Sequence, residues 1–232
     1  MRIDLPQLPM STKDRRQIRK TYAEKLNATE GVDNGMINES IDNYYKPQID
    51  YTDKVCLDLG ANVGAFSQIA LDLGAKHVTA VECDHRNFSK LEESFKGDTS
   101  INLVNAAVTG THAKTLKLYK SSAKNKHCST TIYGKSRYSE YDEVDNVHIS
   151  TLLEKYKPQI IKIDIEGAEY TLMDEILDYF PEVLFIELHG TGKNATNMEL
   201  YTNLLKEKYK HSEIEPLIVF KAVWAHDCLF YK

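Results

Sequence analysis

A glycine turn that begins with a carboxylate is the first feature of this sequence that indicates chemistry. The turn reads DLGANVG over residues 58–64, after a short apolar run and before a segment with helical apolar spacing. Gly60 and Gly64 allow the backbone to come close to a ligand. Asp58 would repel a phosphate and attract an ammonium or sulfonium group, and Asn62 replaces the middle glycine of a dinucleotide fingerprint. The turn therefore predicts a cationic ligand rather than NAD, the alternative being a glycine turn that binds nothing.

A second carboxylate, Glu82, ends the next apolar run, which reads HVTAVEC over residues 77–83. A carboxylate at the end of the second strand of an α/β unit can accept hydrogen bonds from both hydroxyls of a ribose. Glu82 and the glycine turn together predict a ligand that carries a nucleoside.

Three charged residues alternate with isoleucines in the segment QIIKIDIEG, residues 159–167. Strand alternation places Lys162, Asp164 and Glu166 on one side, where charges are costly unless they are paired or used. We expect Asp164 to be catalytic, as a base or as the ligand of a cation, and Lys162 to pair with it or lower its pKa. A purely structural ion pair is the alternative, and Glu166 could instead cap the following helix.

Glu187 and His189 end the next apolar run, EVLFIELHG over residues 182–190, with the same alternation. Histidine is the natural base near neutral pH, so His189 is a further catalytic candidate. The carboxyl ends of adjacent strands are neighbours, so Asp164, Glu187 and His189 also form a candidate cation site, oxygen-rich enough to prefer magnesium or calcium to zinc. A histidine that is simply hydrogen-bonded is the alternative.

These candidate residues need a sheet to hold them, and the pattern of the chain supplies one. From residue 55, short apolar runs alternate with helical spacing, which is typical of a mostly parallel sheet covered on both faces. Strands are expected at 55–60, 77–83, 101–108, 159–167 and 182–190, with helices at 65–74, 87–95, 150–157, 168–180 and 197–209. Two closing strands, 216–220 and 226–232, predict an antiparallel hairpin at the sheet edge. Ser150 is the expected cap of the helix that starts there.

The segment 109–158 interrupts this alternation. Residues 115–119 alternate like an edge strand, 144–149 form another short strand, and 121–141 read as a long polar loop over the site. The loop could supply an acceptor pocket from Ser129, Thr130, Tyr133, Tyr138 and Tyr141. A solvated loop without a binding role is the alternative.

The first 50 residues are expected to form an arm and a helical extension, followed by one domain over 51–232. A charged helix is predicted over 12–27, capped by Ser11 or Thr12, and a short helix around 39–45. The helix over 12–27 carries a basic cluster, formed by Arg15, Arg16, Arg19 and Lys20. We interpret this cluster as a solvated face rather than a contact for phosphate or an acidic partner.

The composition excludes several classes of protein. The 232 residues carry a formal net charge of −5, which offers no broad attraction to nucleic acid or anionic membranes. The four cysteines form no CxxC pair, which argues against structural zinc, and nothing requires disulfides, in keeping with a reducing compartment. The sequence shows no signal peptide and no run of transmembrane length, so we expect a cytoplasmic protein.

Six segments, taken in order, give the chain a resemblance to a known family. They are VCLDLGANVGAFS, VTAVECD, INLVNAAV, VDNVHISTLLEKY, IIKIDIEGAEYTLM and VLFIELHG, over roughly residues 54–190. The sequence resembles the FkbM family of S-adenosylmethionine-dependent methyltransferases. The resemblance implies a Rossmann-like class I methyltransferase fold with a seven-stranded sheet. It also implies that Asp58, Gly60, Asn62 and Gly64 hold the methionine part of the cofactor, that Glu82 holds the ribose, and that Asn105 and Ala106 lie beside the adenine. Cys83 is a further expected cofactor residue.

The expected reaction is methyl transfer to a hydroxyl of a sugar, glycan or other small molecule. Such a displacement requires an aligned acceptor, exclusion of water and removal of a proton. The substrate class rests on the family resemblance alone. Two alternatives remain: a methyltransferase acting on RNA, protein or lipid, and a catalytically silent subunit that binds the cofactor and scaffolds a partner.

Overall fold

A seven-stranded sheet forms the centre of the molecule. The computed structural model describes residues 11–27, 32–46, 48–120, 130–131, 140–190, 195–219 and 222–232. The sheet has the order β10-β11-β9-β8-β1-β2-β3. Its strands are β1 (Val55–Leu59), β2 (His77–Val81), β3 (Ile101–Val104), β8 (Ile160–Ile163), β9 (Val183–His189), β10 (His211–Val219) and β11 (Ala222–Tyr231).

Along the order β3-β2-β1-β8-β9, each strand pairs in parallel with the next, and β11 pairs antiparallel with both β9 and β10. This confirms the Rossmann-like sheet of seven mostly parallel strands, and the closing hairpin at its edge. After β1 the chain builds outward through β2 and β3, and it later returns to the other side of β1 with β8. The strand order therefore reverses between β1 and β8, which is where ligands bind in open α/β sheets.

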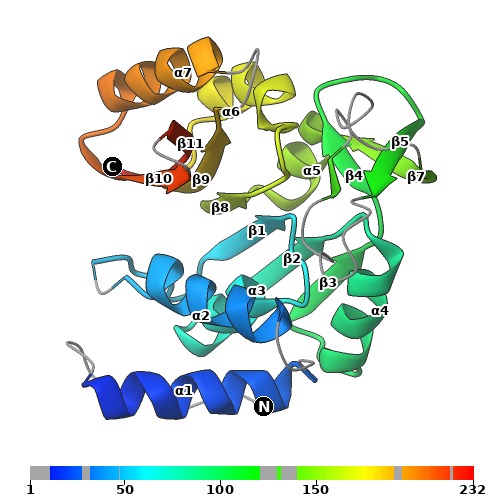
Figure 1. The fold of residues 1–232 in the computed structure, drawn as a ribbon, viewed down its shortest axis with the longest axis vertical. Coiled ribbons are helices and arrows are strands. Elements are labelled where there is room, and N and C mark those ends of the chain that lie inside the picture. Colours follow the sequence, from blue (N-terminus) through cyan, green and yellow to red (C-terminus); the bar gives the residue numbers. More distant parts are fainter. Residues whose placement is uncertain are drawn as a thin grey trace.

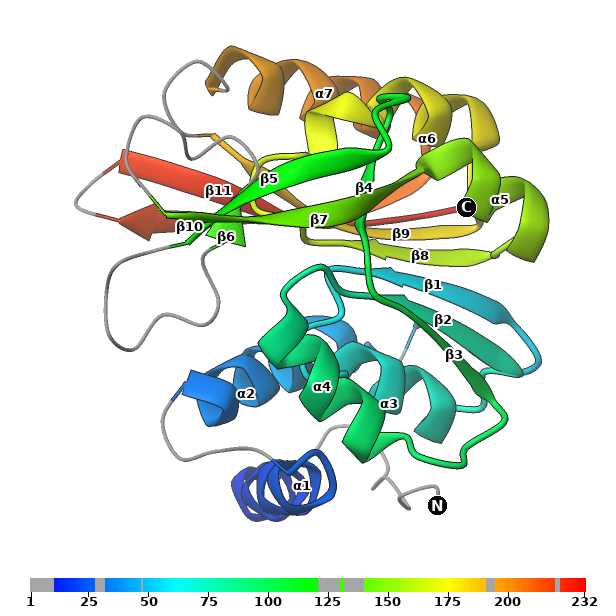
Figure 2. The same ribbon diagram turned by 90° about the vertical axis from the view of Figure 1, so that its right-hand side faces the viewer.

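Helices cover both faces of the sheet (Figures 1 and 2). One face carries α1 (Thr12–Lys25), α2 (Val32–Tyr44), α3 (Ala65–Asp72) and α4 (His85–Ser94); the other carries α5 (Ile149–Tyr156), α6 (Met173–Tyr179) and α7 (Ala195–Lys208). Neighbouring strand residues alternate between two hydrophobic clusters: Cys56 and Phe185 belong to the α1–α4 side, and Leu57 and Leu184 to the α5–α7 side. Both faces of these strands are buried, which explains their nearly continuous apolar sequence.

A second, four-stranded sheet was not predicted. It has the order β4-β7-β5-β6, formed by β4 (Ala107–Thr109), β5 (Thr115–Lys120), β6 (Thr130–Thr131) and β7 (Tyr141–His148). The expected single strand over 101–108 is therefore wrong: it is divided into β3 and β4. Between them, the side chain of Asn105 turns back and donates to the carbonyl oxygen of Glu82 at 2.8 Å.

Helix boundaries also differ from the sequence expectation. α5 is capped by the side chain of His148, which accepts from the backbone N–H of Ser150, so the expected Ser150 cap is wrong. The single helix expected over 168–180 is two pieces, a 3-10 turn (Glu169–Thr171) and α6. Within the described residues, no helix is both long and apolar enough to cross a membrane.

The N-terminal extension packs on the domain rather than standing apart. Ser11 caps α1 through a reciprocal capping box with Asp14, which decides between the two expected caps. Ile18, Tyr22 and Leu26 are buried in the same hydrophobic cluster as α3 and α4. The Tyr22 hydroxyl lies 2.9 Å from the Asp72 carboxylate of α3. Of the predicted basic cluster, Arg15 and Arg19 are paired with Asp42 of α2, and Lys20 is paired with Glu24 within α1.

Candidate functional site

The glycine turn joins β1 to α3 and is shaped by close contacts within the protein. Gly60 has φ +78°, and a Cβ there would lie 1.8 Å from the backbone oxygen of Asp164. Gly64 has φ +92°, and its Cβ would lie 2.5 Å from the ring of Phe95. Asn62 also adopts positive φ, +52°, a conformation that asparagine tolerates better than most residues. Gly60 thus lets the β1 turn touch the turn after β8, which brings the two halves of the site together.

Glu82 is tied to this turn through its carboxylate. One oxygen accepts from the backbone N–H of Asn62 at 2.8 Å, and the other accepts from the N–H of Asp84 at 2.7 Å. Glu82 is only 6% exposed, and burial raises its pKa to about 7 despite the two backbone N–H donors. Each carboxylate oxygen can accept more than one hydrogen bond, so Glu82 can still bind two further hydroxyl groups.

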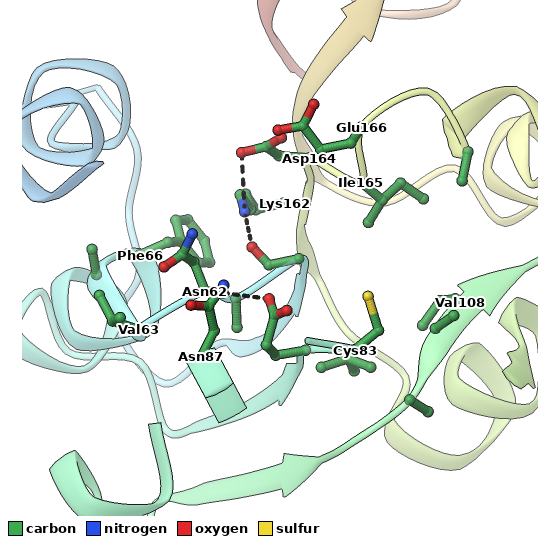
Figure 3. A pocket seen from close by; sticks show the side chains of 18 of the residues that line it. Asn62, Val63, Phe66, Cys83, Asn87, Val108, Lys162, Asp164, Ile165 and Glu166 are labelled. Atoms are coloured by element: carbon green, nitrogen blue, oxygen red, sulfur yellow. Dashed lines mark hydrogen bonds and ion pairs between the residues drawn. The ribbon is translucent and has the colours of Figure 1, made fainter. Parts of the chain in front are cut away.

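A cavity of about 910 Å³, including its open mouth, lies between the turn and β8 (Figure 3). Of the predicted cofactor residues, five line it: Gly60, Asn62, Glu82, Cys83 and Ala106. Asp58, Gly64 and Asn105 do not line it. The predicted catalytic residues Lys162 and Asp164 line its other side, together with Glu166. The structure therefore gathers residues from 60 to 166 around one space.

The Lys162 ammonium contacts both the glycine turn after β1 and the turn after β8. It donates to the backbone oxygen of Gly60 at 2.6 Å and lies 3.4 Å from Asp58 and 3.6 Å from Asp164. Burial alone would lower the pKa of Lys162, but the neighbouring carboxylates outweigh it and raise the pKa. Asp58 is fully buried and also accepts from the Ser67 hydroxyl at 2.7 Å. The side chain of Asp58 thus faces Lys162 and Ser67.

His189 lies among three glutamates beside Asp164. Its Nδ1 is 3.1 Å from buried Glu169, and its Nε2 is 3.4 Å from Glu187 and 3.5 Å from Glu166. Burial lowers the pKa of His189, but the hydrogen bond to Glu169 and the other carboxylates outweigh burial and raise it to about 10. An imidazole with this pKa holds a proton at neutral pH, which disfavours it as a free base.

The predicted cation set is arranged differently from the sequence expectation. Ligand atoms of Asp164, Glu166 and His189 lie within 4.8 Å of one another. Glu187 instead lines a smaller neighbouring cavity of about 380 Å³, although it remains in contact with His189.

Several residues that line the main cavity were not predicted. They are Ser40 and Tyr44 of α2, Phe66 of α3, Asn87 of α4 and Leu118 of β5. The ring of Tyr44 packs edge-on against Phe66 at 5.2 Å and against Phe185 at 5.4 Å. Ser40 and Tyr44 are four residues apart within the short helix predicted near 39–45, so they share one helix face. That spacing was the available signal, but nothing in the sequence says which element the face covers.

The predicted acceptor loop is only partly covered by the described residues. Ser129, Tyr133 and Tyr138 lie outside them, and Thr130 starts β6. Tyr141 begins β7, is 46% exposed, and has the Lys117 ammonium 4.1 Å above its ring.

Residues 58–220 match the family model of the methyltransferase FkbM domain. A search of curated proteins found no match.

Three solved structures illustrate the structural similarity. A candidate RNA methyltransferase from Pyrococcus horikoshii has 15% identity and a TM-score of 0.49, covering 96% of this chain and 99% of that one. A precorrin-6Y C5,15-methyltransferase from Geobacter metallireducens has 12% identity and a TM-score of 0.46, covering 99% and 94%. Fibrillarin from Aeropyrum pernix, with natively bound S-adenosyl-L-methionine, has 10% identity and a TM-score of 0.47, covering 82% and 73%.

Proposed function

The chain belongs to the FkbM methyltransferase family, and we propose that it is an S-adenosylmethionine-dependent O-methyltransferase. The proposed acceptor is a hydroxyl of a sugar, glycan or other small molecule. One observation carries the proposal: a single cavity has Glu82 and the glycine turn on one side and Asp164 on the other. A nucleoside-binding end and a proton-accepting end therefore share one space.

The lining of the cavity fits the proposed cofactor. Ala106, Val108 and Leu118 give an apolar slot for an adenine ring beside Glu82, whose two oxygens can accept from ribose hydroxyls. Gly60 and Asn62 lie where the methionine part would extend toward Asp164. When bound, S-adenosylmethionine supplies an electrophilic methyl group on a sulfonium.

We propose that charged residues at the end of β8 activate the acceptor hydroxyl by removing its proton. Asp164 follows β8 at the carboxyl edge of the sheet, with its side chain 18% exposed. We assign to Asp164 the acceptance of the proton from the acceptor hydroxyl, whose oxygen would then take the methyl group that the bound cofactor would supply. Lys162 pairs with Asp164 and holds its side chain in place, and Asp58 acts as the counterion of Lys162. His189, held by Glu169, positions this edge rather than acting as the base.

Cofactor binding is tested by calorimetry on wild type and Glu82→Ala. We expect S-adenosylmethionine and its demethylated product to bind, and NAD not to bind. Loss of hydrogen bonds to a charged group should cost about 1.5–3 kcal/mol, or roughly 10–150-fold in Kd. Glu92→Ala, at an exposed position of α4, is the matched control. Binding of NAD without binding of S-adenosylmethionine would contradict the proposal.

The acceptor is tested with radiolabelled cofactor and a panel of glycans and metabolites. RNA is the main alternative acceptor; the net charge of −5 and the pairing of Arg15 and Arg19 with Asp42 argue against it. A salt-sensitive gel shift with RNA would favour that alternative. Cofactor binding without turnover on any acceptor would favour a silent scaffold subunit.

A further inference from the structure

Beside Asp164, at the carboxyl ends of β8 and β9, several carboxylates converge on one imidazole. Asp164 and Glu166 follow β8, and His189 ends β9, which pairs in parallel with β8. Ligand atoms of these three residues lie within 4.8 Å of one another, and a Glu187 oxygen lies 3.4 Å from His189 Nε2. Figure 3 shows the Asp164 and Glu166 carboxylates close together at the edge of the cavity.

The orientation of His189 is fixed from the side away from these carboxylates. Glu169 is fully buried, and one of its oxygens lies 3.1 Å from His189 Nδ1 and also accepts from the His189 backbone N–H at 2.7 Å. Its other oxygen accepts from the N–H of Gly167. A carboxylate on Nδ1 is the arrangement that commonly fixes the ring of a metal-binding histidine, with Nε2 left to bind the ion.

His189 Nε2 lies close to two carboxylates, those of Glu187 and Glu166. The His189 residue is 6% exposed, and in the part of the chain that the structure describes no hydrogen bond reaches Nε2. Glu187 and Glu166 approach it to 3.4 and 3.5 Å, as ion-pair contacts only. The only ammonium near Asp164 among the described ion pairs, that of Lys162, is shared with Asp58. In the free protein the proton on His189 supplies the positive charge at the centre of this group, and a bound divalent cation would replace that proton.

We propose that Asp164, Glu166 and His189 bind one hard divalent cation, with Glu187 beside it as a further ligand. Ligands on opposite sides of a Ca²⁺ ion are about 4.6–5.2 Å apart, from its usual oxygen distances, so the observed spacing needs little adjustment. An oxygen-rich set with one imidazole suits magnesium, manganese or calcium. The set differs from the sequence expectation by including Glu166.

The site does not depend on the proposed function, but its catalytic role rests on it. A cation at this place lies beside Asp164, at the end of the cavity where the acceptor hydroxyl would arrive. It would bind the acceptor oxygen and lower the pKa of that hydroxyl, while the second oxygen of Asp164 accepts the proton.

Binding is measured with Mn²⁺ alone on the full chain without cofactor, by calorimetry and by electron paramagnetic resonance. We expect one Mn²⁺ per chain, with at least tenfold weaker binding in Glu166→Gln. The Glu166 side chain is 34% exposed, so the variant should fold, as a thermal melt will check. Glu215→Gln, in the neighbouring acidic cavity, is the matched control and should bind normally. No stoichiometric binding, or equal affinity in Glu166→Gln, would overturn the site and leave a proton on Nε2 as the neutralising charge.

A second variant tests the supporting contact. Glu169→Gln should weaken Mn²⁺ binding by about 10–100-fold, the usual effect of losing the partner of a metal-bound histidine. Unchanged Mn²⁺ affinity in folded Glu169→Gln would contradict the proposed orientation of His189.

Separate experimental outcomes would contradict the cation site and the proposed methyltransferase function. Full methyl transfer after exhaustive chelation would overturn the catalytic role of the cation while the methyltransferase proposal stands. Tight Mn²⁺ binding in a protein that does not bind S-adenosylmethionine would support the site and contradict the proposed function.

Discussion

The substitution Asp164→Asn separates a catalytic carboxylate from a structural ion pair. Asparagine keeps the shape of the side chain but removes the charge, so it cannot accept the acceptor proton. Removal of a general base commonly lowers rate by about 10²–10⁴-fold. We therefore expect a folded protein that binds the cofactor and turns over poorly.

The structure predicts that this variant folds. Lys162 keeps its hydrogen bond to the Gly60 oxygen at 2.6 Å and its contact with Asp58 at 3.4 Å. Asp164 is partly exposed and 3.6 Å from Lys162, so its loss should cost on the order of 1 kcal/mol or less. In a protein of this length, that changes Tm by roughly 2–4 °C at most.

Asp58→Asn is the matched comparison, since it removes the other carboxylate of Lys162. Asp58 is fully buried, and breaking a buried pair by removing one partner costs about 3–5 kcal/mol. This corresponds to a fall in Tm of roughly 6–20 °C. Asp164→Asn should therefore lose turnover and keep most of its stability, whereas Asp58→Asn should lose stability.

The assay combines initial rates with labelled cofactor, cofactor affinity by calorimetry, and thermal melts on the same preparations. Near-normal turnover of Asp164→Asn would refute the catalytic role. A larger loss of stability in Asp164→Asn than in Asp58→Asn would show that Asp164 is the structural partner of Lys162 and would refute the argument from burial.

Three further predictions concern the cofactor end and the extension. Burial raises the pKa of Glu82 to about 7 from 4.5; cofactor affinity should rise with pH until about 7, and Glu82→Gln should flatten this profile in calorimetry. The same shift means that the free energy of unfolding of the free protein falls between pH 4.5 and 7, because the folded state holds the extra proton there. In urea unfolding, Gly97→Ala should lower the free energy of unfolding by roughly 1–2 kcal/mol, and Gly60→Ala should lower it by several times as much. Both glycines have φ +78°, but only at Gly60 would the added Cβ clash with the backbone of Asp164. Equal losses in the two variants would contradict this close approach. Leu26 is fully buried, so Leu26→Ala should lower the free energy of unfolding by about 2–5 kcal/mol. Leu204 is 37% exposed, so Leu204→Ala should change it little. A small loss in Leu26→Ala would mean that the N-terminal extension does not share the hydrophobic core.

Features that depend on neighbouring residues could be predicted from the amino-acid sequence. Alternating apolar runs and helical spacing predicted the parallel strands and their order along the chain, because a strand buried on both faces must be nearly all apolar. The glycine turn and Glu82 predicted a nucleoside-type ligand, since a turn between strand and helix constrains both residue types locally. The charged alternation after residue 161 also marked Asp164 for the site.

The pairing of the charged side chains with one another could be seen only in the folded protein. The sequence assigned Asp58 to the ligand and Glu187 to a cation, but the pairing of β1 with β8 turns Asp58 toward Lys162. The turn after β8 brings Glu166 to His189 and Asp164. Side-chain alternation specifies a face of a strand and cannot specify which strand lies beside it. Distances between charges depend on that choice, so partners some 100 residues apart, such as Asp58 and Lys162, became visible only once the sheet was assembled.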